Sequence, residues 1–74
     1  MLIGEMKMIR YQVWKHVEKE IDGITLFYFY DAPVGDVVYK TIGAALYQLS
    51  HDERTCACPD IKYFYIKEIE CNEN

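Results

Sequence analysis

The side chains with the most chemical potential are one histidine and three cysteines in the second half of the chain. His51, Cys56, Cys58 and Cys71 follow the pattern H-x4-C-x-C, with the last cysteine twelve residues further on. Zinc prefers thiolate and imidazole ligands, and four of them complete a tetrahedral site. The C-x-C spacing is tighter than that of zinc knuckles, and Cys71 lies near the chain end. A small zinc-binding domain is therefore an alternative interpretation, and our main prediction includes no metal and no cofactor.

The same region also places an acid, a base and a thiol close together in the sequence. His51, Asp52, Glu53 and Arg54 are followed by Cys56. A cysteine nucleophile needs a histidine about 2.6 to 3.2 Å away and a third group that orients it. Nothing in the sequence fixes that geometry, whereas a histidine near a helix C-terminus is favoured there as a cation. We therefore expect a solvated helix end rather than a catalytic site, and a protein that is not an enzyme.

Length, composition and charge exclude several classes of protein. The 74 residues are 51% hydrophobic and 15% aromatic, which is too apolar for a disordered chain. The net charge is −4 and the lysines are scattered, which disfavours direct binding to nucleic acid. The four glycines are isolated, so there is no phosphate-binding loop. We expect one cytoplasmic domain over residues 1–74, without a signal peptide or a membrane-spanning helix.

A β-hairpin is expected in the first half of the chain, with strands over residues 8–21 and 24–30. Polar and apolar residues alternate in the first run, although apolar residues at every fourth position also fit a helix. The Asp22-Gly23 pair favours the strand, because a type I′ turn needs positive φ at both central residues. The second run is β-branched and aromatic, as strands are. This turn would pair Val17 with Tyr28 and His16 with Phe29.

A helix and a third strand are expected in the second half. Pro33 ends the second strand, and a helix follows from residue 35 or 36 to Ser50, with Asp36 in its first turn. Its apolar stripe consists of Val38, Ile42, Ala45, Leu46 and Leu49. A loop over 51–60 then leads to a strand over 61–70. Residues 1–7 are expected to be an extension, and residues 71–74 a frayed tail.

The order of these elements predicts an α+β fold. It is a small ββαβ domain, a split β-α-β, because the helix returns the chain to a new strand of the same sheet. The first strand would lie in the middle, antiparallel to both neighbours. We therefore predict a three-stranded, mostly antiparallel sheet in the order 2-1-3, with one helix packed on one face.

Large apolar side chains point to both faces of this sheet, although one helix can cover only one face. An antiparallel sheet with one wet face should alternate apolar and polar residues. In the expected register, Trp14, Phe27 and Phe29 share a face with His16. Burial of one such ring stabilises a protein by roughly 1.5 to 3 kcal/mol, so we expect a second covering layer. The alternative is a small monomeric core closed by residues 1–7 folding back.

These features predict a non-catalytic protein-binding module. It would form a homodimer or dock on a partner protein through an aromatic sheet face or a free edge strand. Small inhibitors and regulators, including those of phages and mobile elements, belong to this physical class. The residues expected to bind the partner are Trp14, His16, Phe27, Phe29, Phe64 and Ile66. A second alternative is an acidic nucleic-acid mimic that blocks a DNA-binding protein, with an acidic rim of Glu18, Glu20, Glu68 and Glu70.

Overall fold

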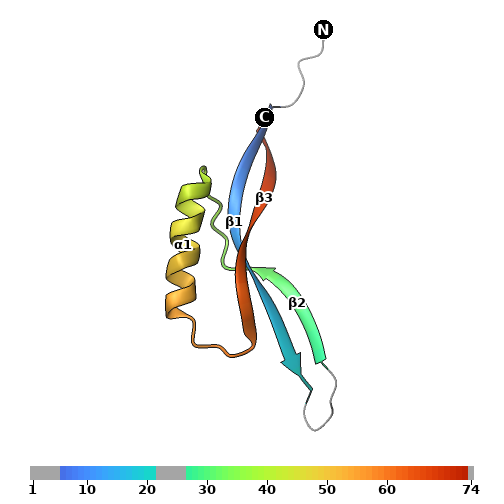
Figure 1. Ribbon diagram of the computed structural model, residues 1–74. Coiled ribbons are helices and arrows are strands. Elements are labelled where there is room, and N and C mark those ends of the chain that lie inside the picture. Colours follow the sequence, from blue (N-terminus) through green and yellow to red (C-terminus); the bar gives the residue numbers. More distant parts are fainter. Residues whose placement is uncertain (1–5, 22–26, 74) are drawn as a thin grey trace.

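The computed structural model describes residues 6–21 and 27–73 (Figure 1). The elements along the chain are β1 (Met6–Glu20), β2 (Phe27–Pro33), α1 (Ile42–Thr55) and β3 (Ile61–Glu73). The strands form one sheet in the order β2-β1-β3, and β1 is antiparallel to both neighbours. The helix packs on one side of this sheet. The predicted α+β architecture and its strand order are confirmed.

The two long strands extend further than the sequence predicts. β1 begins at Met6, and β3 continues to Glu73, where these two residues pair. Residues 71–73 are therefore part of a strand, not a frayed tail. The start of β1 and the end of β3 form backbone hydrogen bonds with each other, which neither segment would have alone.

The predicted register of β1 with β2 is wrong by two residues. Val17 pairs with Tyr30 and His16 pairs with Asp31. A shift of two residues keeps every side chain on its expected face, so His16 still shares a face with Phe29. β2 also continues to Pro33, which an edge strand tolerates. The expected turn at residues 22–23 and the start of the expected second strand, 24–26, lie outside the described residues.

The helix begins later than predicted because the chain first continues along β1. Two backbone hydrogen bonds join Tyr39 to Tyr11, with N···O distances of 2.8 and 2.7 Å. Thr41 is the helix N-cap, and its hydroxyl accepts the amide of Ala44 at 3.2 Å. Asp36 consequently lies in the connection before the helix, not in its first turn. A residue that pairs in a sheet cannot also have helical dihedral angles, which explains the late start.

The helix also ends later than predicted, at Thr55. His51 lies inside it, and the hydroxyl of Thr55 donates to the carbonyl oxygen of His51 at 2.9 Å. The connection to β3 is therefore shorter than the expected loop over 51–60. In the described residues no helix has the length and apolar character needed to cross a bilayer.

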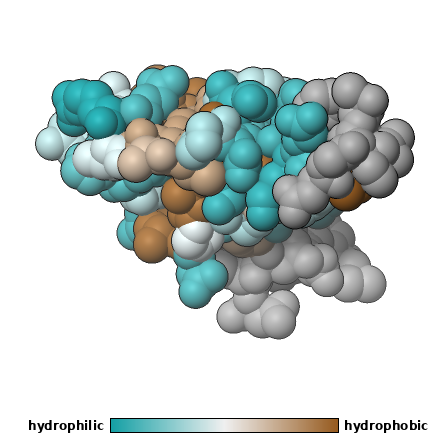
Figure 2. Space-filling model, turned by 90° about the horizontal axis from the view of Figure 1, so that it is seen from below, coloured by the Kyte–Doolittle hydropathy of each residue, from teal (hydrophilic) through white to brown (hydrophobic). Residues whose placement is uncertain are grey.

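The core between α1 and the sheet is thin. Among the described residues, the buried apolar side chains are Val13, Val17 and Ala45, and the strands that α1 contacts are β1 and β3. Two members of the predicted helix stripe, Ile42 and Leu46, are about half exposed. Figure 2 shows apolar side chains reaching the surface between hydrophilic ones.

The chain is also elongated. Its extents are 62 × 26 × 14 Å and its radius of gyration is 16.3 Å. A compact domain of this length has a radius of about 11 Å. The small core and the long sheet together leave much apolar surface that no other described residue covers.

Candidate functional site

The face of the sheet opposite to α1 has no covering element among the described residues. We call it the open face. Alternation along the strands places the even-numbered residues of β1, the odd-numbered residues of β2 and the odd-numbered residues of β3 from Tyr63 onward there. Its central side chains are Gln12, Trp14, His16, Glu18, Phe29, Asp31, Tyr63, Tyr65 and Lys67. The buried Val13 and Val17 point the other way, toward the helix.

A polar cluster of four side chains lies at the middle of the open face, and we call it the His16 cluster. His16 Nδ1 is 2.6 Å from Asp31 Oδ1, and His16 Nε2 is 3.0 Å from Glu18 Oε2. The hydroxyl of Tyr65 donates to Asp31 Oδ2 at 2.5 Å. These contacts connect side chains from all three strands across the sheet.

The hydrogen bonds shift the proton affinities of the cluster. The bond to Asp31, and then that to Glu18, raise the pKa of His16 above its usual 6.5. The bond from Tyr65, and then that from His16, lower the pKa of Asp31. The bond to Asp31 raises the pKa of Tyr65 to about 12. Both partners of the imidazole are carboxylates, which only accept hydrogen bonds, so the geometry favours an imidazolium.

An imidazolium held in this way cannot act as a general base. With both nitrogens protonated and bonded to carboxylates, the ring has no lone pair with which to act as a general base. The cluster instead fixes the positions of its neighbours. The ring of His16 stacks on Tyr63 with centroids 4.9 Å apart and lies 6.1 Å from the ring of Phe29.

Two aromatic side chains of the open face are well exposed to solvent. Phe29 is 67% exposed and Tyr63 is 53% exposed. Trp14 is less accessible, because Lys67 Nζ lies 4.0 Å from the centroid of its ring and its indole N–H donates to Gln12 at 3.0 Å. The accessible part of the face is therefore an apolar patch beside a charged network.

The predicted partner-binding residues divide between the two faces. Trp14, His16 and Phe29 lie together on the open face as expected. Phe64 pairs with Lys15 and Ile66 pairs with Val13, so both point to the helix side. Parity along β3 explains the separation, since even-numbered positions there face α1.

Phe27 is the remaining predicted partner-binding residue. Its backbone belongs to β2, opposite Glu20. Its side chain lies outside the part of the chain that the structure describes.

Sequence reasoning missed Asp31 and Tyr65 as members of the site. The predicted second strand ends at residue 30, which leaves Asp31 outside the sheet. The sequence does place Asp31 on the face of Phe29, because residues two positions apart in a strand point to the same side. An edge strand can also continue up to a proline. No local sequence pattern predicts that the side chain of Tyr65 reaches Asp31 across β1.

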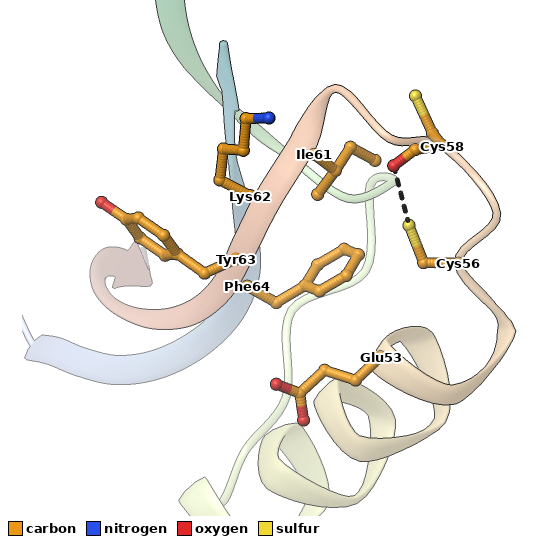
Figure 3. Close-up of a pocket in the computed structure, with 7 residues that line it drawn as sticks. All are labelled: Glu53, Cys56, Cys58, Ile61, Lys62, Tyr63 and Phe64. Atoms are coloured by element: carbon orange, nitrogen blue, oxygen red, sulfur yellow. Dashed lines mark hydrogen bonds between the residues drawn. The ribbon is translucent and has the colours of Figure 1, made fainter.

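The cysteine loop borders a hollow of about 330 Å³ between the end of α1 and the start of β3 (Figure 3). Its lining residues are Glu53, Cys56, Cys58, Ile61, Lys62, Tyr63 and Phe64. The Cys56 thiol points to the carbonyl oxygen of Cys58, at 3.7 Å (Figure 3). All three cysteines are free thiols.

The structure does not bring the predicted zinc ligands together. Cys71 pairs with Met8 at the far end of β3, roughly 30 Å along the strand from Ile61. Within residues 6–21 and 27–73, no group of three or more His, Cys, Asp or Glu side chains is arranged to hold a metal ion. The hydrogen bonds found there also include none between the ring of His51 and a thiol.

The expected acidic rim is likewise separated by strand parity. Glu18 and Glu20 are on the open-face side of β1. Glu68 and Glu70 pair with odd-numbered residues of β1 and point to the opposite side. The four carboxylates therefore do not form one contiguous surface of the kind a nucleic-acid mimic needs.

Comparison of the chain with known proteins finds no matching family model, no matching curated protein and no matching solved structure. The geometry of the open face is therefore the basis for a functional proposal.

Proposed function

We propose that this chain is a non-catalytic, cytoplasmic protein-binding module that docks on another protein through its open face. The observation that carries the proposal is the exposure of Phe29 and Tyr63 on a face that no described element covers. Aromatic side chains at the centre of a surface are typical of binding hot spots. The physical class is that of small inhibitors and regulators, which act by occupying a partner.

The charges around this patch indicate what the partner presents. Glu18, Glu20 and Asp31 lie on the same side of the β1–β2 hairpin as Phe29, and His16 contacts two of these carboxylates. The whole chain has a net charge of −4. A complementary partner surface has an apolar side chain that contacts Phe29 and a lysine or arginine beside it.

The hydrogen bonds of the His16 cluster support the same proposal. Tyr65, Asp31 and His16 join the three strands on the open face itself. A surface held in one arrangement before binding loses less conformational entropy when a partner docks. The network therefore contributes to affinity without having to touch the partner.

The decisive experiment compares Phe29→Ser with the control Tyr47→Ser. Tyr47 is 75% exposed but lies on α1, on the other side of the molecule. Each variant is immobilised, proteins captured from a cell extract are identified by mass spectrometry, and the affinity of the purified partner is measured by calorimetry. We expect Phe29→Ser to weaken binding about 30-fold and Tyr47→Ser to leave it unchanged.

Both substitutions should leave the fold intact, because each removes a largely exposed ring; the free energy of unfolding should change by less than about 0.5 kcal/mol. The proposal fails if no protein is captured specifically. It also fails if the captured protein binds Phe29→Ser as tightly as it binds the unmodified chain.

A further inference from the structure

The outer edge of β3 is a long strand edge that no strand of residues 6–21 or 27–73 pairs with. β3 has 13 residues, and its pairing with β1 has no register shift from Tyr63 to Glu73. It lies at one side of the sheet (Figure 1), so alternate backbone N–H and C=O groups point away from β1. The other edge strand, β2, has 7 residues and ends at Pro33. Short length and proline protect β2 against pairing, and β3 has neither protection.

The order of side chains along β3 is complementary to itself when the strand is reversed. In an antiparallel pair of two β3 strands centred on Tyr65, Tyr63 pairs with Lys67 and Phe64 with Ile66. Lys62, the residue that the ladder with β1 skips, lies opposite Glu68 at the end of this regular segment. Apolar residues meet apolar residues, and each lysine meets a carboxylate or an aromatic ring. By symmetry each of these pairs occurs twice.

The neighbouring registers lack this match. Centring the pair on Ile66 places Phe64 opposite Glu68. Centring it on Phe64 places Lys62 opposite Ile66. The side chains therefore select one alignment, and that alignment is two-fold symmetric.

The surface area of the chain is consistent with a partner copy. Its accessible surface is 5873 Å², whereas a compact monomer of 8.8 kDa exposes about 4,800 Å². The excess is larger than the roughly 800 Å² that each partner buries in a standard interface.

We propose that two copies of this chain associate through their β3 edges, antiparallel and centred on Tyr65, to form one six-stranded sheet. The two-fold axis is perpendicular to the sheet, so both helices lie on one face and the two open faces join on the other. The inference goes beyond docking by the open face and does not depend on what that face binds.

A charge exchange at one cross-strand pair tests the register. Lys62 and Glu68 are both exposed in the single chain. Sedimentation should give a mass of twice 8.8 kDa for the unmodified protein. Lys62→Glu alone, or Glu68→Lys alone, places like charges opposite each other twice and should raise the dimer Kd about tenfold or more. The double variant Lys62→Glu/Glu68→Lys should restore the original Kd.

Matched controls make each outcome decisive. Lys40→Glu changes the net charge as Lys62→Glu does, but lies between β2 and α1 and should leave the Kd unchanged. Lys62 also donates to the carbonyl oxygen of Pro59 at 3.3 Å, so Glu68→Lys tests the same pair without disturbing that contact.

The proposal is overturned if the unmodified protein is still a monomer at a concentration of about 100 µM. It is also overturned by a dimer that the single exchanges leave intact, or by one that the double exchange fails to restore. Phe29→Ser should dimerise normally, which separates this inference from the proposed function.

Discussion

The His16 cluster concentrates three pKa shifts in side chains from three strands. Its members lie far apart in the sequence: His16 and Asp31 are 15 positions apart, and Asp31 and Tyr65 are 34 positions apart. Each hydrogen bond favours one charge state: a cation on His16, an anion on Asp31 and a neutral phenol on Tyr65. Folding and proton binding are therefore linked at this cluster.

We predict that stability falls as pH rises through the raised pKa of His16. The folded state binds this proton more tightly than the unfolded state, whose histidine has a pKa near 6.5. The contribution is fully present below 6.5 and is lost as pH passes the folded value. Urea unfolding measured at several pH values between about pH 6 and pH 8.5 detects the loss, because the interval starts below the unfolded pKa of histidine and rises above it.

His16→Gln should remove that slope, and His51→Gln, which alters a helix residue away from the cluster, should retain it. An equal slope in His16→Gln and in the unmodified protein would show that the imidazolium is not the source. NMR titration of the His16 ring protons gives the folded pKa directly.

Among the elements, α1 and the centre of β1 carry the buried contacts of the domain. Val13 is 2% exposed and Ala45 is fully buried, whereas the apolar residues at the ends of the sheet remain accessible. With so few buried residues, each one contributes a large part of a net stability that is small in any short domain.

We therefore expect Val13→Ala to lower the free energy of unfolding by about 2 kcal/mol, through two lost methyl groups and the cavity that remains. Val37→Ala is the matched control. Val37 is 57% exposed, so the same change there should cost less than about 0.5 kcal/mol. Urea denaturation of both variants measures the difference, and similar losses would contradict the assigned core.

At the scale of the whole molecule, the sheet is longer than its helix can cover. β1 pairs with β2 over residues 14–20 and with β3 over most of its length, while α1 contacts β1 and β3 but not β2. The hairpin therefore extends beyond the helix-covered part, as Figure 1 shows. This arrangement leaves the open face and the β3 edge available at the same time.

Small-angle X-ray scattering should detect this shape at a protein concentration at which sedimentation shows the chain to be a monomer. We expect a radius of gyration close to 16.3 Å, well above the value of about 11 Å for a compact chain of equal length. A radius near the compact value would contradict the extension of the hairpin beyond the helix-covered part of the sheet.

The sequence by itself determined the kind and order of the elements. The β-rich runs and the apolar helix stripe are local patterns, and connection rules then led to the 2-1-3 sheet. Alternation also placed Trp14, His16 and Phe29 on one face correctly, although the register was wrong by two residues, because a shift of two conserves parity.

Only the tertiary structure decided the register of the hairpin, the start of α1 and the composition of the site. The helix start depends on a bridge between Tyr39 and Tyr11, and the cluster depends on Tyr65 reaching Asp31 across β1. These contacts join residues separated by 28 and 34 positions, counting from 11 to 39 and from 31 to 65. Propensity and periodicity act over a few residues, so they contain no information about such pairs; the pairs form because the folded sheet brings the three strands within hydrogen-bonding distance.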